Sequence, residues 1–251
     1  LSHHTGLNYQ WLPSKLLLFG SYSTAFDPST PVDARTGRIQ RNETTEGYEA
    51  GLRGRTLAKR LAYSVSGVLL YNHHIARRNP LYNDPVADAA QNQPQLVAAG
   101  EERFTGAKFE FKWKTTDTVS AQIKGSYVRA ITTASPDLPA EVGRPIARLP
   151  AFTLNSSIRG APPGGRNGLI WGLGWQYVSG YVANYADPRR DFLDYPGYGL
   201  VTLNTGYQWQ LGKRQLRLDT QLRNALNRDL LASHARANAP RELTVTARLT
   251  F

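Results

Sequence analysis

Apolar and polar residues alternate along most of this chain, and no other feature limits its possible fold so strongly. The C-terminal stretch reads RELTVTARLTF. One parity of this stretch is apolar throughout: Leu243, Val245, Ala247, Leu249 and Phe251. The other parity carries threonines and an arginine. Because successive side chains of a β-strand point to opposite faces, a period of two residues predicts a strand with one apolar and one polar face.

The same alternation recurs along the sequence and predicts about eleven strands, whereas helical spacing fits no segment as well. The predicted strands cover the start of the chain to Trp11 and the segments 14–25, 48–52, 61–71, 109–113, 119–127, 152–159, 169–181, 201–209, 216–223 and 243–251.

Short and long connections alternate strictly between these strands. The short ones are turn sequences rich in Pro, Gly, Asp and Lys: LPSK, TLAKR, KTTDT, PPGGRNG and LGKR. The longer polar connections cover 26–43, 77–97, 134–149, 182–196 and 226–238. This alternation predicts an antiparallel up-and-down sheet with its turns at one end and its loops at the other. Transmembrane β-barrels have this asymmetry, with short periplasmic turns and longer extracellular loops.

Aromatic residues favour a membrane barrel over a soluble sandwich. Tryptophans lie close to the short turns, at Trp11, Trp113, Trp171 and Trp209. Tyrosines on the apolar parity lie next to the long loops, at Tyr22, Tyr48, Tyr71, Tyr127 and Tyr181. Two rings of amphipathic aromatics are typical of the two membrane–water interfaces. A soluble sandwich would bury its aromatics in mid-strand against a facing sheet.

The hydrophilic composition agrees with a barrel, because only the outward parity has to be apolar. The mean hydropathy is −0.44 and the formal net charge is +11, with Lys+Arg 30 against Asp+Glu 19. The longest apolar runs, such as LLLF, are far shorter than the roughly 20 residues of a membrane-spanning helix. The basic balance favours an anionic partner. The chain contains no cysteine, so the redox compartment is not indicated by that residue.

Several stretches together resemble one family. LFGSYSTAFDPST followed by NETTEGYEAGLRGR is similar to the paired strands of TonB-dependent outer-membrane receptors, especially ferric-siderophore receptors. AAGEERFTGAKFEFKWK resembles a later strand of that family, LRLDTQLRNALNRDLL its penultimate strand, and Phe251 its aromatic end. The matching positions are Tyr22, Ser23, Phe26, Pro28, Glu43, Tyr48, Glu49, Gly51, Gly100, Glu101, Gly106, Glu110 and 223–227.

The resemblance implies a 22-stranded barrel filled by an N-terminal plug that carries the TonB box. Neither segment is recognised in these residues, and bacterial single-chain barrels have even strand numbers. We therefore expect residues 1–251 to be a single, N-terminally incomplete domain, the C-terminal half of such a barrel in the bacterial outer membrane. The implied function is TonB-energised uptake of a ferric siderophore, with no enzymatic activity and no cofactor.

The implied partners are outer-membrane lipid and lipopolysaccharide, a ferric siderophore, TonB acting through a plug outside these residues, and the barrel-assembly machinery. That machinery would read Phe251. Arginines and tyrosines of the external loops suit a polar or anionic chelate. The candidates are Arg77, Arg78, Tyr82, Tyr185, Arg189 and Arg190. The alternative is that the loop arginines meet lipopolysaccharide phosphates or solvent.

The polar parity is itself basic. Its cations Lys108, Lys112, Lys124, Arg159, Arg217, Arg223 and Arg248 outnumber Glu110 and Asp219. A positive lumen wall suits either an anionic substrate or an acidic plug surface, and the sequence does not separate these two interpretations.

No metal or catalytic site is expected. The pairs His3–His4 and His73–His74 are adjacent residues, whose side chains point to opposite faces of a strand. The same holds for the neighbouring carboxylates Glu101 and Glu102, which makes them a poor acid–base pair.

Three other functions fit the sequence less well. A self-contained translocator or passive porin of about twelve strands would need an even strand count and a helix ahead of the first strand. An outer-membrane hydrolase would need a nucleophile beside a histidine near one rim. Nucleic-acid binding is the weakest alternative, because the basic residues follow one strand parity and the loops and do not form a patch.

Overall fold

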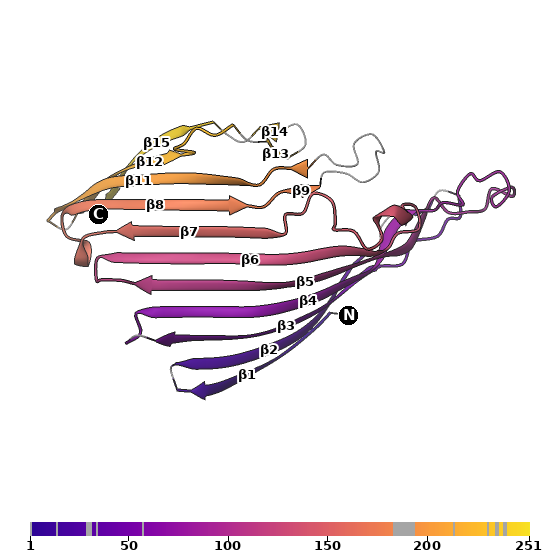
Figure 1. The fold of residues 1–251 in the computed structure, drawn as a ribbon, viewed down its shortest axis with the longest axis horizontal. Helices are drawn as coiled ribbons and strands as arrows, with labels where there is room; N and C mark the ends of the chain where they lie inside the picture. Colours follow the sequence, from indigo (N-terminus) through magenta and orange to yellow (C-terminus); the bar gives the residue numbers. More distant parts are fainter. Residues whose placement is uncertain are drawn as a thin grey trace.

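The computed structural model describes residues 2–13, 15–28, 32–33, 35–56, 58–182, 194–212, 214–229, 231–233, 236–237 and 240–251. Eleven strands form one antiparallel sheet in which each strand pairs with its neighbours along the chain (Figure 1). In sheet order they are β1 His3–Leu12, β2 Leu16–Asp27, β3 Glu43–Thr56, β4 Leu61–Arg78, β5 Leu96–Lys114, β6 Val119–Ala134, β7 Phe152–Gly160, β8 Gly168–Val178, β11 Tyr198–Leu211, β12 Arg214–Arg223 and β15 Glu242–Thr250. The predicted up-and-down sheet of about eleven strands is confirmed.

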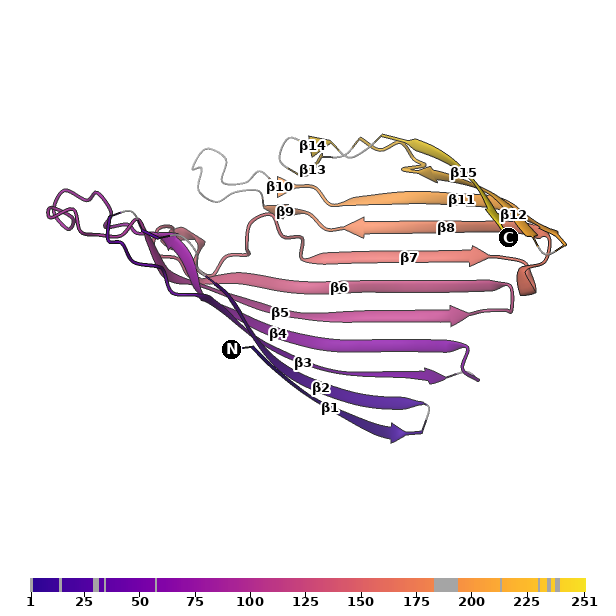
Figure 2. The same cartoon turned by 180° about the vertical axis from the view of Figure 1, so that it is seen from behind.

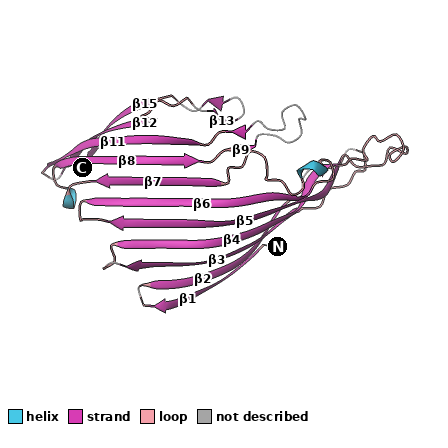
Figure 3. Ribbon diagram, viewed as in Figure 1, coloured by secondary structure: helices cyan, strands magenta, loops and turns pink. Residues whose placement is uncertain are grey.

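Outside this sheet the described residues form only small elements. Two-stranded pairs join β9 Tyr181–Val182 to β10 Asp194–Tyr195 and β13 Leu231–Ser233 to β14 Arg236–Ala237. Two short 3-10 helices cover η1 Pro139–Glu141 and η2 Pro163–Gly165 (Figure 3). Within the described part of the chain, no helix has the length and apolar character needed to cross a lipid bilayer.

The connections separate by length at the two ends of the sheet. The described residues of the turns after β1, β3, β5, β7 and β11 lie at one end, and the described residues of the long connections 28–42, 79–95 and 135–151 lie at the other (Figures 1 and 2). We call these the turn end and the loop end. The last strand runs toward the turn end, so the described C-terminus lies there, as Figure 1 shows.

Strand register gathers the apolar parity on one face of the sheet. One row runs across the pairs Tyr9↔Leu18, Leu18↔Leu52, Leu52↔Val65 and Val65↔Phe109. The neighbouring row on the opposite face includes Arg53, Ser64, Glu110, Lys124 and Asn155. Directly paired residues share a face, so the sheet has an apolar outer face and a polar inner face.

The apolar face is not covered by a second layer in the described structure. Leu7 is 73% exposed and Val245 60%, while the buried apolar residues are few: Ala130, Ile131, Val178 and Tyr195. The sheet curves but does not close, because β1 and β15 are its two edges. The sheet is therefore a partial barrel whose apolar surface is directed outward.

Two strands extend well beyond the alternating sequence pattern. β4 has 18 residues and β5 has 19, so at roughly 3.4 Å per residue both exceed the roughly 25 Å apolar band of a membrane barrel. The pairing of β4 with β5 is irregular between Asn72 and Ile75, where His74 has a φ of 62°. Beyond such a bulge, the residues that face the inside of the barrel belong to the opposite parity from those before it. This irregularity explains why Arg77 and Arg78, expected in a loop, are the last residues of β4.

Candidate functional site

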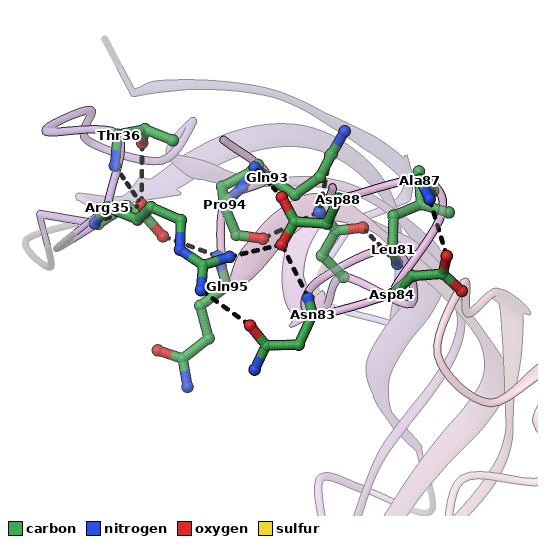
Figure 4. Close-up of polar contacts among 12 residues, drawn as sticks. Arg35, Thr36, Leu81, Asn83, Asp84, Ala87, Asp88, Gln93, Pro94 and Gln95 are labelled. Atoms are coloured by element: carbon green, nitrogen blue, oxygen red, sulfur yellow. Dashed lines mark hydrogen bonds and ion pairs between the residues drawn. The ribbon is translucent and has the colours of Figure 1, made fainter. Parts of the chain in front are cut away.

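Two long loops pack against each other beyond the loop end of the barrel wall. Asp33 organises the first loop, because its Oδ1 accepts hydrogen bonds from the backbone N–H groups of Arg35 and Thr36, at 3.1 and 2.8 Å. Its Oδ2 accepts one from the backbone N–H of Gln95 in the second loop, at 2.8 Å (Figure 4). The hydrogen bond from Thr36, and then that from Gln95, hold the pKa of the Asp33 carboxyl below its ordinary value.

An ion pair completes the contact between these loops. Arg35 Nη1 lies 2.5 Å from Asp88 Oδ2, and the Asp88 side chain is fully buried (Figure 4). Asp88 also accepts hydrogen bonds from the backbone N–H groups of Asn83 and Gln93, both at 2.9 Å. Burial alone would raise the pKa of the Asp88 carboxyl, but the amides of Gln93 and Asn83 and the charge of Arg35 together lower it.

The Arg35 guanidinium makes two further contacts with the second loop. Its Nη2 donates to Asn83 Oδ1 at 2.8 Å, and its carbon lies 4.2 Å from the centroid of the Tyr82 ring. Buried charges are stabilised only when such partners satisfy them, and here both members are satisfied. We call this arrangement of Asp33, Arg35 and Asp88 the loop clasp. It makes the two loops one structural unit.

A second network lies at the loop end of the inner wall and involves a third loop. Arg77 Nη2 lies 3.5 Å from Glu102 Oε1, and Arg77 Nη1 lies 3.6 Å from Glu141 Oε2. Glu141 belongs to η1, within the connection 135–151. A Cβ atom added to Gly100 would lie 2.8 Å from Arg77 Cγ, so the absence of a side chain at position 100 leaves room for the side chain of Arg77. Arg77 therefore anchors the third loop to the wall.

The structure locates part of the predicted ligand-binding set. Arg77, Arg78 and Tyr82 lie at the same end of the sheet, but Arg77 and Tyr82 are engaged by the contacts above, and Arg78 is exposed. The other three candidates, Tyr185, Arg189 and Arg190, lie outside the described residues.

The turn-side tryptophans lie on the apolar parity of their strands. Trp113 pairs with Leu61 and Ala121, Trp171 with Gly160 and Thr205, and Trp209 with Leu216. Trp11 is also on this parity, on the edge strand β1, and is 61% exposed.

Four of the five loop-side tyrosines lie on the strands of the barrel wall. The ring centroids of Tyr22 and Tyr48 lie 4.9 Å apart, the ring of Tyr71 stacks on that of His73, and Tyr127 is 51% exposed. Tyr181 differs from the expectation, because β8 ends at Val178 and Tyr181 belongs to the separate strand β9. Its ring stacks on Tyr195 of β10, with centroids 5.0 Å apart.

Phe251 follows the last residue of β15 and is 82% exposed. The Arg214 guanidinium lies 5.1 Å from its ring centroid. Because Arg214 begins β12, this contact fixes the terminal aromatic at the turn end of the sheet.

The histidine pair on β4 is engaged in ordinary contacts. His73 Nδ1 lies 3.6 Å from Glu101 Oε1, and His74 Nδ1 lies 3.2 Å from Thr44 Oγ1. In the residues with described positions, no group of three or more His, Cys, Asp or Glu side chains is placed to hold a metal ion.

The inner wall near the turn end is strongly basic. Three hollows of about 580, 350 and 380 Å³ follow one another along this wall. Arg55 and Lys112 line the first two, and Arg159 lines the last two. We call the cations that line them the basic band: Lys15, Arg53, Arg55, Lys59, Arg60, Lys112, Lys114, Arg159, Arg217 and Arg248.

Sequence reasoning recognised part of this band and missed the rest. It identified Lys112, Arg159, Arg217 and Arg248 by strand parity. Parity would also have found Arg53 and Arg55, which alternate with Leu52 and Gly54 on β3. Lys15 and Lys59 lie in turns, where side chains do not alternate between two faces. Only the fold therefore shows that they lie beside the cations of the strands.

These features define a class of protein. An antiparallel up-and-down sheet with an apolar outer face, aromatic residues near both ends and a polar inner face is the wall of a transmembrane β-barrel.

Residues 1–225 match the family described as TonB dependent receptor-like, beta-barrel. The chain therefore belongs to the TonB-dependent receptor β-barrel family, whose barrels are found in the bacterial outer membrane.

Solved structures with the same fold include receptors for iron chelates. BauA, the ferric preacinetobactin receptor from Acinetobacter baumannii, has a TM-score of 0.78 and 17% identity over 97% of this chain and 35% of its own. The ferripyoverdine receptor of Pseudomonas aeruginosa has a TM-score of 0.76 and 18% identity over 97% of this chain and 32% of its own.

The ferric-catecholate import receptor Fiu from E. coli K12 has a TM-score of 0.73 and 14% identity over 97% of this chain and 34% of its own. The chain thus spans about a third of the length of each of these receptors. Among curated proteins, none matches the sequence.

Proposed function

We propose that residues 1–251 are the C-terminal half of the barrel of an outer-membrane receptor that takes up a ferric siderophore with energy delivered through TonB. The observation that carries this proposal is the match of the whole eleven-stranded sheet to the ferric preacinetobactin receptor, at a TM-score of 0.78. Family membership over residues 1–225 supports it.

In this proposal the chain supplies a wall and ligand contacts. The outer face meets lipid and lipopolysaccharide, and the barrel-assembly machinery recognises the C-terminal strand with Phe251. TonB acts through a plug segment outside these residues. Neither edge strand, β1 or β15, pairs with the other, and unpaired backbone groups are costly in hydrocarbon. Further strands of the receptor would pair with both edges.

Ligand capture belongs to the loop end. We propose that Arg78 and Tyr82, with Arg77, Tyr185, Arg189 and Arg190, face the chelate. Arg78 is the exposed cation of this set in the described structure, whereas Tyr82 is held beside the loop clasp. Guanidinium groups suit the carboxylate and hydroxamate oxygens of ferric chelates, because they form charge-assisted hydrogen bonds with them.

The test is uptake of radioactive iron by cells that carry the complete receptor as their only route for ferric chelates. A panel of hydroxamate-type, citrate-type and catecholate-type complexes would be compared in strains with and without TonB. We expect TonB-dependent uptake of one chelate class and growth on it under iron limitation. Equal uptake in both strains would indicate passive diffusion through a porin. TonB-dependent uptake of a vitamin or glycan, with no ferric chelate carried, would overturn the siderophore assignment.

A further inference from the structure

Two arginines interrupt the apolar outer face of the sheet near its loop end. Arg103 shares its parity on β5 with Trp113, and Arg129 shares its parity on β6 with Tyr127. Both arginine side chains are exposed. Charged residues on the lipid-facing parity of a membrane barrel lower its stability unless they lie near the headgroups. The two arginines therefore have a cost that the fold alone does not explain.

Strand register places the two arginines next to each other. Arg103 pairs with Ile131 and Arg129 pairs with Thr105, so the arginines are diagonal neighbours on one face of the sheet. Diagonal neighbours are roughly 7–8 Å apart, a distance that long side chains can span. Two guanidinium groups can thus converge on one anion.

The described part of the chain supplies no such anion. Neither guanidinium forms an ion pair or a side-chain hydrogen bond with a residue that the structure describes. Glu46 belongs to the same outer row as Arg103, but Tyr71 lies between them on β4. Glu101 Oε1 lies 3.6 Å from His73 Nδ1. Because neighbouring like charges destabilise a sheet, the arginine pair requires an anion from outside these residues.

The height of the pair on the barrel wall matches that of a lipid headgroup. Arg103 is ten residues from Trp113 along β5, which is roughly 34 Å of strand and roughly 26 Å of height for a strand tilted by about 40°. Trp113 lies near the turn end, and the apolar band of a membrane barrel is roughly 25 Å tall. Tyr71 pairs with Arg103, and Tyr127 is two residues from Arg129. The arginines are therefore at the level of the loop-side tyrosines, where headgroups replace hydrocarbon.

Charge and geometry favour a phosphate monoester as the bound group. Guanidinium groups form paired, charge-assisted hydrogen bonds with phosphate oxygens. A phosphate monoester carries about −1.5 to −2 charges near pH 7 and so balances two arginines, whereas a phosphodiester carries a single negative charge. An acidic soluble protein would meet the loops and not a face that lipid covers.

We propose that Arg103 and Arg129 together bind the phosphate monoester of a lipid headgroup in the membrane leaflet at the loop end. One lipid is held at a fixed place on the barrel by its phosphate, while its acyl chains cover the apolar parity of β5 and β6. The site selects a monoester over diester and zwitterionic headgroups. The inference rests on the part of the proposed function in which the outer face meets lipid, and it does not depend on the uptake of iron.

Native mass spectrometry of the complete receptor in detergent tests this selection. Phosphatidic acid carries a phosphate monoester, phosphatidylglycerol a diester and phosphatidylcholine a zwitterionic headgroup. We expect phosphatidic acid to be retained several-fold more than phosphatidylglycerol, and Arg103→Gln with Arg129→Gln to lower its retention about tenfold. Lys108→Gln with Lys124→Gln is the matched control, because it removes the same charge from the inner parity of β5 and β6. Equal retention of phosphatidic acid and phosphatidylglycerol, or equal losses in the two double variants, would overturn the proposal.

A thermal measurement shows whether the variants fold and whether the bound group is a lipid. In phosphatidylcholine vesicles, added phosphatidic acid should raise the temperature at which the folded receptor disappears on a semi-native gel. We expect this rise in the unchanged receptor and in the inner-face control, and none in the arginine-to-glutamine variant. Arg103→Lys with Arg129→Lys keeps both charges but loses the paired geometry, so its rise should be intermediate. No rise in the unchanged receptor, or the same rise with inorganic phosphate alone, would overturn the lipid site.

Uptake of ferric chelates is measured separately in cells. Lipid selection without uptake would reject the iron-transport function and retain this inference, whereas uptake without lipid selection would do the reverse.

Discussion

The guanidinium of Arg35 and the carboxylate of Asp88 meet at 2.5 Å although 53 positions separate them in the chain. This contact joins two loops beyond the barrel wall, where the chain could otherwise vary its conformation independently at each loop. The loop clasp thus joins residues 35–40 of the first loop and 79–95 of the second into one surface at the loop end (Figure 4).

Replacing the buried carboxylate should release the two loops from each other. In the variant Asp88→Asn, Arg35 loses its ion-pair partner, so we expect amide hydrogen exchange in 79–95 to become about tenfold faster. Hydrogen-exchange mass spectrometry of the complete receptor measures this. Asp84→Asn is the matched control, because Asp84 accepts hydrogen bonds from Val86 and Ala87 of its own loop. Equal acceleration across both loops in the control would show that the clasp has no special role.

The clasp should also weaken in acid. The pKa values of Asp33 and Asp88 are lowered in the folded protein, so their stabilising contribution is complete above the ordinary value of 3.8 and is lost as the pH falls through the lowered values. We expect loop protection to stay level from pH 8 to about pH 5 and to fall below about pH 4. Proteolysis by an acid-active protease across this range provides the measurement. Loss of protection already near neutral pH would contradict the assignment to these carboxylates.

A charged residue placed on the outer face of a strand, away from its ends, should lower the stability of the barrel. Val65 lies on the outer parity of β4 between Leu61 and the loop-side Tyr71, so Val65→Arg should destabilise the assembled barrel by about 2–4 kcal/mol. Thr202→Arg is the comparison, because Thr202 lies on the inner parity opposite Gly174. Urea unfolding of the complete receptor in lipid vesicles would distinguish them. If both variants unfolded at the same urea concentration, the assignment of the two faces would be wrong.

One glycine makes room for a turn-side tryptophan. A Cβ atom at Gly160 would lie 2.2 Å from Trp171 Nε1, so Gly160→Ala should displace the indole and cost about 1–3 kcal/mol. Gly172→Ala is a close control, since the nearest atom to its added Cβ is a carbonyl oxygen at 3.5 Å. The temperature at which the folded form disappears on a semi-native gel reports the difference. A smaller effect at Gly160 than at Gly172 would be inconsistent with this packing.

The terminal aromatic is expected to serve assembly more than folded stability. Phe251→Ala should reduce the amount of receptor in the outer membrane several-fold, whereas Arg214→Ala, which removes only the neighbouring guanidinium, should leave that amount near normal. Quantitative blotting of membrane fractions gives both values. Equal losses in the two variants would mean that Phe251 acts through its contact with Arg214.

Much of the fold was predictable because its causes are local. The number of strands follows from alternation, and the two ends follow from turn composition, since each depends on neighbouring residues alone. The outward direction of Trp113 and Trp171 followed in the same way. The extension of β4 to Arg78 was not predictable, because the bulge at His74 interrupts the alternation.

The sequence by itself determined which parity of each strand is apolar and where the chain turns. These two features together specify a barrel wall with distinct ends. Only the tertiary structure decided that Arg35 meets Asp88, that Arg77 is held by Glu102 and Glu141, and that Lys59 joins Lys112 and Arg159 in one basic band. The physical reason is that alternation acts between adjacent residues, whereas these contacts depend on strand register, bulges and loop packing, which bring together residues that are distant in the chain.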